Sequence, residues 1–269
     1  GVVADFEIAQ KMLRYFLNKA GAKRYISKPT VIVAVPPVVT SVEQRAIKDA
    51  AYGAGARKVY VIEEPMAAAI GSGLPVQEPL GSMIVDIGGG TSDIAVISLG
   101  GVVSSRSLRV GGDAMDNSIV NYIKNKYHVL IGERTAEELK MSIGSAFATH
   151  EDGHALIRGR DLRSGLPTEI TVSSEEIRNA IEEQISRIIE AIKSTLDLTP
   201  PDLVADLVTT GMTLAGGGAM IKGLVQRITK ECGMPVRIAE DPLTSVVIGA
   251  GICAENMGLL KQVVLPEKR

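Results

Sequence analysis

The sequence predicts an α/β fold of two related halves with a smaller lobe inserted between them. Residues 31–73 and 212–251 follow one order: strand, helix, strand, an acid–acid–proline junction, then a helix that runs into Gly-x-Gly. Strands and helices that alternate in this way are typical of α/β sheets. The segment between the two repeats differs, with a polar hairpin and a long amphipathic helix. These observations predict a ligand cleft between the halves, where such proteins commonly bind.

The first half reads as helix, strand, helix, strand, helix. Apolar residues recur at helical spacing over residues 5–19, and the apolar run at 30–35 predicts a strand that is buried on both faces. Thr40 and Glu43 match a capping box, which predicts a helix through Ala50. The run RKVYVIEEP predicts a second strand, and MAAAIGSG a short, tightly packed helix.

Residues 83–97, MIVDIGGGTSDIAVI, predict a hairpin with an unusual turn. Three consecutive glycines cost more backbone entropy than a structural turn needs. One interpretation is a tight hairpin with spare glycines. The other is a loop whose backbone N–H groups approach an anion, with the carboxylate of Asp86 near a cation. A second glycine run, at 216–218, also follows a strand.

The inserted segment predicts two helices and a hairpin. Thr135 begins a helix, with Glu138 placed to complete a capping box. A polar hairpin follows over residues 155–172, with Gly159 and Gly165 as its turn residues. Ser174 opens a long helix that ends before the two prolines at 200–201. Its apolar stripe comprises Ile177, Ile181, Ile185, Ile188, Ile189, Ile192 and Leu196.

Composition excludes several classes of function. The net charge of −2 gives no electrostatic footprint for nucleic acid, and 3% aromatic residues offer little base stacking. No apolar run approaches the roughly 18 residues of a membrane span, and no signal peptide is recognisable. Neither a Walker loop nor a G-x-G-x-x-G fingerprint occurs, so P-loop and Rossmann sites lack their motifs.

The motifs VIEEPMAAAIGSGLPV, DIGGGTSDIAVISLGG, RVGGDAMDNSIVNYI, IGERTAEELKMSIGSA and TPPDLVADL together resemble the MreB family of bacterial actin homologues, within the superfamily of actin, DnaK-type chaperones and sugar kinases. The resemblance covers essentially the whole sequence. It implies an actin-like fold of two ribonuclease-H-like halves around a nucleotide cleft. Residues 1–79 would belong to the first half, 80–131 and 199–253 to the second, 132–198 to the inserted lobe, and 254–269 to a helix that returns to the first half.

The resemblance also implies an ATP and Mg²⁺ site. Asp86 would lie near the metal, acting through water, and Glu64 would position or activate the attacking water. On the residues alone, Glu64 could instead be an acid favoured at a helix N-terminus. Glu137 and Lys140 could form a solvated ion pair, and Glu138 could serve as a cap before it serves as a ligand. The implied nucleotide-binding residues are Gly88, Gly89, Gly90, Thr91, Gly111, Gly112, Glu137, Glu138, Leu139, Lys140, Gly216, Gly217, Gly218 and Ala219.

The function implied by this resemblance is that of a slow Mg²⁺-dependent ATPase of the cytoskeleton. Such a protein polymerises into filaments on the inner face of the cytoplasmic membrane and works with cell-wall synthesis and shape proteins to set rod shape. Tyr25 and Ile26, flanked by basic residues, would form the membrane-contacting loop. The alternative is the ATPase domain of a DnaK-type chaperone or a sugar kinase-like enzyme. Each would need a further substrate-binding part, and we recognise none.

Members of the family carry a first phosphate loop of the form D-[LI]-G-T ahead of the position that matches Gly1. The present sequence contains no such loop. We therefore expect it to be a piece of a longer protein, and we expect the piece alone to bind nucleotide poorly.

Overall fold

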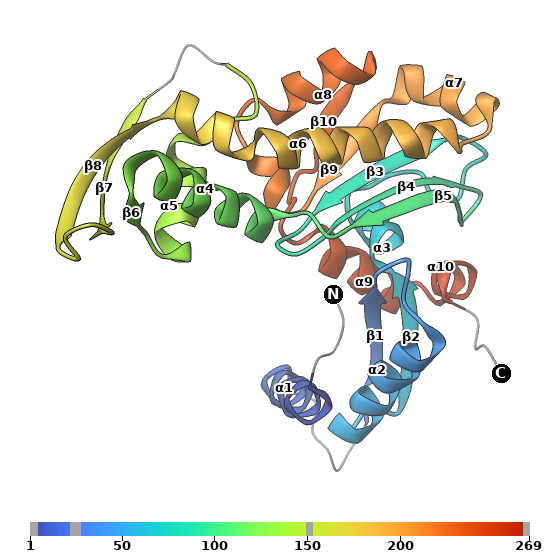
Figure 1. Cartoon of the computed structure of the whole chain (residues 1–269). Coiled ribbons are helices and arrows are strands. Elements are labelled where there is room, and N and C mark those ends of the chain that lie inside the picture. Colours follow the sequence, from blue (N-terminus) through green and yellow to red (C-terminus); the bar gives the residue numbers. More distant parts are fainter. Residues whose placement is uncertain (1–4, 22–27, 149–152, 266–269) are drawn as a thin grey trace.

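The computed structural model of the chain describes residues 5–21, 28–148 and 153–265 (Figure 1). The loop with Tyr25 and Ile26, predicted above to contact a membrane, lies outside these residues. The described chain forms a five-stranded sheet with helices on both faces. A lobe with a three-stranded sheet lies at one end of it, and a unit with a two-stranded sheet lies below the five-stranded sheet (Figure 1). Within these ranges, no helix combines the length and the apolar character that crossing a membrane requires.

The first half contains a parallel strand–helix–strand unit. β1 pairs with β2 in parallel, and α2 connects them. The predicted capping box of Thr40 and Glu43 is confirmed, and α2 continues beyond Ala50 until Gly55 adopts a left-handed conformation. The elements of this part are α1 (Phe6–Lys19), β1 (Thr30–Val35), α2 (Ser41–Ala54), β2 (Lys58–Glu63) and α3 (Glu64–Gly71).

The burial predicted for β1 is wrong. Only Val35, at its end, is buried, while Val31 to Ala34 are half-buried. The continuous apolar run is typical of a strand inside a wide sheet, but among the described residues β1 has β2 as its one neighbour. Burial of both faces depends on tertiary surroundings that the strand's own residues do not supply.

The second half is built on five strands in the order β10–β9–β3–β4–β5. β3 and β4 form the predicted antiparallel hairpin, and β9 joins the other side of β3 in parallel. The carboxyl ends of β3 and β9 therefore meet at one edge of the sheet. The strands and their helices are β3 (Ser82–Ile87), β4 (Ser92–Ser98), β5 (Gly101–Leu108), α4 (Gly112–Tyr127), α7 (Pro201–Thr210), β9 (Met212–Ala215), the 3₁₀ helix η1 (Gly217–Met220), α8 (Leu224–Cys232), β10 (Val236–Ile238), α9 (Ser245–Glu255) and α10 (Met257–Val263).

Helices cover this sheet on both faces. Successive residues along its strands therefore join two different cores, one on each face. Met83 and Val85 join the core beneath α4 and the long helix α6 (Ser174–Asp197), whereas Ile84 joins the core beneath α3 and α9. The isoleucine stripe predicted on α6 is buried over its length, with Leu196 partly buried at its end. α6 runs from the small lobe across β4 and β5, so one helix stiffens both parts (Figure 1).

The small lobe consists of β6 (Val129–Leu130), α5 (Glu133–Ile143), β7 (His154–Asp161) and β8 (Pro167–Ser173). Gly165 is a turn residue with φ of +73°, as predicted, but Gly159 is not. Gly159 lies inside β7, opposite Thr168. A Cβ at Gly159 would stand 2.4 Å from Val129 Cγ1, so this glycine admits the neighbouring strand β6.

The capping box predicted at Thr135 is also wrong. α5 begins earlier, at Glu133, after Gly132, and no side chain caps it. The carboxylate of Glu138 accepts a hydrogen bond from Arg134 Nε at 3.1 Å. Because Thr135 already lies inside the helix, the Thr135–Glu138 spacing is an ordinary helical one and marks no start.

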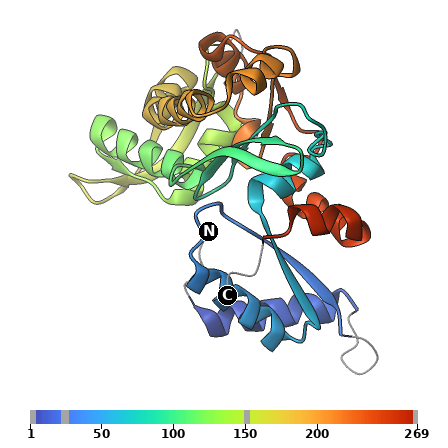
Figure 2. The same cartoon turned by 90° about the vertical axis from the view of Figure 1, so that its right-hand side faces the viewer.

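The two helices that follow the acid–acid–proline junctions pack directly on each other. α3 and α9 cross between the five-stranded sheet and the β1–β2 unit (Figures 1 and 2). A Cβ at Gly71 would lie 1.9 Å from the carbonyl oxygen of Ser245, and a Cβ at Gly249 would lie 1.9 Å from that of Ala67. The backbones of the two equivalent helices are therefore in contact. After α10 the chain returns to the first half, where Leu265 N–H donates to Val61 O at 2.8 Å.

Candidate functional site

A cavity of about 460 Å³ lies at the edge where β3 and β9 end. Its walls come from the two glycine runs, from the start of α4 and from α5. An isolated bridge between Ser145 and Lys222 ties the loop after α5 to the loop after η1 beside this cavity. The lining residues used below are Gly88, Gly89, Gly112, Asp113, Asp116, Glu137, Lys140, Gly217, Gly218, Met220, Lys222 and Leu243.

The first glycine loop, Gly88 to Thr91, is held by the N-terminus of α4. Gly112 N–H donates to Gly88 O at 3.0 Å, and Asp113 N–H donates to Gly89 O at 2.9 Å. Gly111 makes this contact possible, because a Cβ there would lie 2.5 Å from both loop carbonyls. The loop carbonyls are thus turned toward the protein and are satisfied there.

The glycines of this first loop are not required by the fold. A Cβ at Gly89 would meet Asp113 Oδ1 at 3.4 Å, which is ordinary contact, and a Cβ at Gly90 would meet nothing within 4 Å. Neither residue has a positive φ. The bare backbone therefore leaves space on the side where Gly88 and Gly89 line the cavity. This observation favours the anion-loop interpretation over a hairpin turn with spare glycines.

The second glycine run is required by the fold. Gly216 has φ of +78° and ψ of 165°, a region open essentially to glycine alone. A Cβ there would lie 2.3 Å from Ile87 O and 2.5 Å from Asp86 Oδ1. A Cβ at Gly218 would lie 2.2 Å from Ile87 Cγ2. These glycines let η1 pack on the end of β3, with Ala219 buried.

Three carboxylates gather beside the first loop on the α3 face of the sheet. Asp86 follows Ile84 on that face, and Asp93 stands directly opposite Asp86 in the antiparallel register. Glu64 is the first residue of α3. Burial, and then the charges of Asp93 and Asp86, raise the pKa of Glu64 from its usual 4.5 to about 7. Burial and the charge of Asp93 raise the pKa of Asp86 to about 6.

The raised pKa distinguishes Glu64 from an ordinary first-turn acid. A carboxylate favoured only by the helix dipole would be stabilised in its charged form, whereas here the charged form is disfavoured. Burial also raises the pKa of the neighbouring Glu63, whose Oε2 is buried without a hydrogen-bond partner in the described structure. A group that titrates near neutral pH is suited to general base chemistry.

Sequence reasoning missed Asp93. It is 2% exposed, its Oδ2 accepts a hydrogen bond from Thr91 Oγ1 at 3.1 Å, and its Oδ1 is buried with no partner among the described residues. Burial raises the pKa of Asp93, and its hydrogen bonds from Ser107 and Thr91 oppose that rise. The hairpin register was the available signal, because it pairs Asp93 with Asp86 across the two strands.

α5 contributes Glu137 and Lys140 to the cavity wall. The ion pair considered between these two is not the one that forms. Lys140 Nζ reaches α4, where it lies 2.8 Å from Asp116 Oδ2 and 3.2 Å from Gly112 O. Asp116, one turn beyond Gly112 on the same helix, is a further lining residue that sequence reasoning missed.

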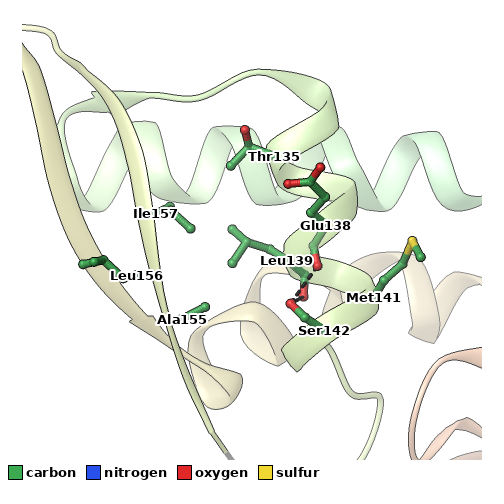
Figure 3. Close-up of a pocket in the computed structure, with 8 residues that line it drawn as sticks. All are labelled: Thr135, Glu138, Leu139, Met141, Ser142, Ala155, Leu156 and Ile157. Carbon is green, nitrogen blue, oxygen red and sulfur yellow. Dashed lines mark hydrogen bonds between the residues drawn. The ribbon is translucent and has the colours of Figure 1, made fainter.

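Glu138 and Leu139 lie elsewhere. They line a separate, shallow pocket of about 470 Å³ between α5 and β7, together with Thr135, Met141, Ser142 and residues 155–157 (Figure 3). Leu139 is 2% exposed and belongs to the core. The geometry therefore brings Glu137 and Lys140 to one cavity with part of each glycine loop, and it separates Glu138 and Leu139 from them. The predicted residues that do not line this cavity are Glu64, Asp86, Gly90, Thr91, Gly111, Gly216 and Ala219.

No group of three or more histidine, cysteine or carboxylate side chains within the described ranges has the arrangement of a metal site. Mg²⁺ does not require one, because it keeps most of its waters and is bound by one or two carboxylates together with substrate phosphates. The site's chemistry is a glycine loop open to an anion, flanked by buried carboxylates that a nearby cation would stabilise.

The chain is similar to known proteins over nearly its whole length. The family described as MreB/Mbl protein matches residues 1–262. The cell shape-determining protein Mbl of Bacillus subtilis is 47% identical over 97% of this chain and 78% of its own length. The cell shape-determining protein MreB of Escherichia coli K12 is 49% identical over 96% of this chain and 75% of its own length.

Solved structures show the same relationship. The crystal structure of MreB5 of Spiroplasma citri bound to ADP has a TM-score of 0.91 at 39% identity, covering 96% of this chain and 77% of the other. A second structure of that protein contains AMPPNP and has a TM-score of 0.90. A MamK double helical filament has a TM-score of 0.80 at 22% identity over 94% of this chain, which shows a shared fold.

Proposed function

The chain belongs to the MreB/Mbl family, a family of actin-like proteins of cell shape, and on that basis we propose that it binds Mg·ATP in the cavity between the two glycine runs and hydrolyses it slowly. The observation that carries this proposal is the first loop. Its glycines leave space that the fold does not need, at the mouth of a cavity and beside buried carboxylates. One relative with 39% identity holds ADP in one structure and AMPPNP in another.

The first loop would bind the phosphates. Backbone N–H groups of Gly89 and Gly90 would reach phosphate oxygens, since neither residue has a side chain of its own to block the approach. Asp86 would hold Mg²⁺ through water, and Asp93, its cross-strand neighbour, would add negative charge behind it. The metal would supply charge neutralisation to the phosphates. The raised pKa of Asp86 fits this assignment, because a carboxylate that is destabilised when charged gains most from a nearby cation.

Glu64 would position the attacking water and take up its proton. Its carboxylate has a pKa of about 7 and lies next to Asp86 and Asp93. Such a group typically contributes about 10²–10⁴-fold in rate. Glu137 and Lys140 of α5 would face the nucleoside, together with Gly217, Gly218, Met220 and Leu243 from the second-loop side.

We further propose that the protein assembles into filaments at the cytoplasmic face of the membrane and acts with cell-wall synthesis proteins. Its relatives in Bacillus subtilis and Escherichia coli are cell shape-determining proteins, and family membership supports the same role here. The proposed membrane contact is the loop with Tyr25 and Ile26. Pelleting of assembled protein with anionic liposomes tests it, and the Tyr25→Ser, Ile26→Ser double variant should pellet much less.

Two substitutions test the ATP site in the protein encoded by the complete reading frame. Asp86→Ala should weaken Mg²⁺-dependent ATP binding about tenfold or more, because it removes the carboxylate that is proposed to hold Mg²⁺ through water. Glu64→Ala should leave binding intact and reduce turnover about 10²–10⁴-fold. Asp241→Asn is the matched control, because Asp241 occupies the equivalent acid–acid–proline position of the repeat and is exposed. Wild-type turnover in Glu64→Ala would contradict the role given to Glu64.

A further inference from the structure

A buried ion pair joins the two helices on one side of the cavity. Lys140 projects from α5 to α4, where its ammonium lies 2.8 Å from Asp116 Oδ2 and 3.2 Å from Gly112 O. The side chains are 12% and 11% exposed. Both residues line the cavity. The pair is therefore placed where a ligand would meet it, and most of its surface is shielded from water.

The geometry of the ammonium leaves one donor for a ligand. A lysine ammonium carries three N–H groups. Two of them are directed to the Asp116 carboxylate and the Gly112 carbonyl, and in the described part of the chain no third acceptor lies within hydrogen-bond distance. Because both acceptors belong to α4, they fix the direction of the remaining N–H, and Lys140 itself borders the cavity.

A purely structural role for Asp116 would lower the stability of the folded protein. Its Oδ2 accepts from Lys140, but its Oδ1 is buried with no partner among the described residues. A buried carboxylate with an unsatisfied oxygen costs stability, and such ion pairs can often be replaced by apolar residues without loss. Glu137 and Asp113 add negative charge near it. What this carboxylate does achieve is to orient the Lys140 ammonium.

We propose that Asp116 is a positioning residue: with the Gly112 carbonyl, it holds Lys140 so that the free N–H meets an acceptor oxygen of the bound nucleotide. The inference rests on the ATP site proposed above and adds to it a residue whose effect on binding passes through Lys140. A ribose hydroxyl and a phosphate oxygen offer the same acceptor chemistry. The position of Lys140 next to Gly112, at the start of the helix that holds the first loop, is compatible with either.

The test is a double-mutant cycle in the protein encoded by the complete reading frame, with Mg·ATP binding measured by titration of a fluorescent ATP analogue and by competition. Asp116→Asn keeps the shape of the side chain and removes its charge. We expect Asp116→Asn and Lys140→Met each to weaken binding about tenfold, as expected for a charge-assisted hydrogen bond. The double variant should be about as weak as either single variant, because Asp116 acts through Lys140.

Lys126→Met is the matched control. Lys126 also pairs with a carboxylate across helices, lying 2.6 Å from Glu176 Oε1, and it is away from the cavity. It should leave the Kd unchanged. Thermal unfolding of each variant, recorded without nucleotide, separates a loss of folding from a loss of binding. If Asp116→Asn does not fold, Lys140→Met with the competition series below carries the test.

Competition with 2′-deoxy-ATP, 3′-deoxy-ATP and inorganic triphosphate identifies the acceptor. If Lys140 meets a ribose hydroxyl, Asp116→Asn and Lys140→Met should lose the preference for ATP over one deoxy analogue. If it meets a phosphate oxygen, both should bind triphosphate more weakly than wild type does. Unchanged competition by all three ligands, wild-type affinity in a folded Asp116→Asn, or losses that multiply in the double variant would each overturn the inference. A wild-type protein that binds no Mg·ATP would instead refute the proposed function.

Discussion

The two glycine runs look alike in the sequence, but the fold requires only one of them to be glycine. Gly89 and Gly90 meet almost nothing when a Cβ is added, and neither has a positive φ. Gly216 and Gly218 would each place a Cβ within 2.3 Å of Ile87. The side-chain positions of the first run are uncrowded, and two of its glycines line the cavity, whereas the second run is the packing surface on which η1 meets β3.

This difference separates two kinds of requirement for glycine. A glycine that the fold needs should lower stability when replaced, while a glycine that a ligand needs should lower binding and leave the fold intact. Both runs line the same cavity, so position alone would not tell them apart. Measuring stability and nucleotide affinity on matched variants turns the comparison into an experiment.

The largest effect is expected at Gly216. Gly216→Ala combines a backbone conformation that is essentially restricted to glycine with a Cβ 2.3 Å from Ile87 O. We expect the free energy of unfolding to fall by about 3 kcal/mol or more, as measured by urea denaturation. Gly233→Ala is the control, because Gly233 also has a positive φ but meets nothing within 4 Å. Gly233→Ala should lower the free energy of unfolding by about 1 kcal/mol, because it introduces backbone strain but no steric clash. Equal losses would show that packing at Gly216 is irrelevant.

The second effect should appear in binding alone. Gly89→Ala places a methyl group at the cavity, next to Asp113, without a clash or a positive φ. Unfolding stability should stay within about 0.5 kcal/mol of wild type or rise slightly, because alanine restricts the unfolded chain. Mg·ATP affinity should fall about thirtyfold, or about 2 kcal/mol, through the loss of backbone contacts to phosphate. If Gly89→Ala lowered stability and left the affinity unchanged, the first glycine run would be a structural turn and not a phosphate-binding loop.

A third effect concerns pH and the carboxylates beside the first loop. The folded pKa of Glu64, about 7, lies above its usual 4.5, so the folded chain binds this proton more tightly than the unfolded chain does. The contribution of Glu64 to stability therefore falls as pH rises from 4.5 to 7 and stays low above 7. Glu64→Gln should stabilise the nucleotide-free protein by about 1–2 kcal/mol at pH 8 and have little effect at pH 4.5.

Asp241→Asn serves as the control for this measurement, because the equivalent carboxylate of the repeat is exposed. Its stability should follow wild type at every pH. A gain at pH 8 that is as large in Asp241→Asn as in Glu64→Gln would mean that net charge, and not the buried site, causes the effect. Thermal unfolding without Mg²⁺ or nucleotide provides the readout.

The smallest effect is expected on α5. Glu137→Gln removes a carboxylate from the cavity wall and should weaken Mg·ATP binding about threefold, or about 0.7 kcal/mol. Glu138→Gln alters the adjacent residue, which instead pairs with Arg134 on the exposed side, and should leave the affinity unchanged. If the two variants exchanged these outcomes, the cavity would not be the nucleoside site.

Local patterns predicted most of the fold. The apolar runs of β3 and β9, the capping box of α2 and the isoleucine stripe of α6 are each determined by neighbours in sequence, and each was predictable. A helix that begins without a side-chain cap was not predictable. Nothing in Gly132–Glu133 marks the beginning of α5. The two repeats could be recognised in the sequence. The contact between their equivalent helices, α3 and α9, could not.

Pairings within one hairpin and pairings between separate elements differ in what the sequence reveals. The register of the β3–β4 hairpin was an available signal for Asp93, which it places opposite Asp86. The pairing of Lys140 with Asp116 on α4, and not with Glu137 on its own helix, depends on how two helices pack and has no local signal. The same limit applies to the two glycine runs. Whether a glycine is needed by the chain or by a ligand depends on where Ile87 comes to lie, and the glycines themselves carry no sign of it.

The contact between α3 and α9 limits how this protein can change during evolution. A side chain at Gly71 or Gly249 would collide with backbone atoms of the other helix, at Ser245 or Ala67. A second substitution usually rescues an overpacked core by making a neighbour smaller. Here the nearest atoms are main-chain carbonyl oxygens of Ser245 and Ala67, which no substitution can shrink. Neither position can therefore accept a side chain while these two helices cross where they do, so both should stay glycine in any descendant that keeps this fold.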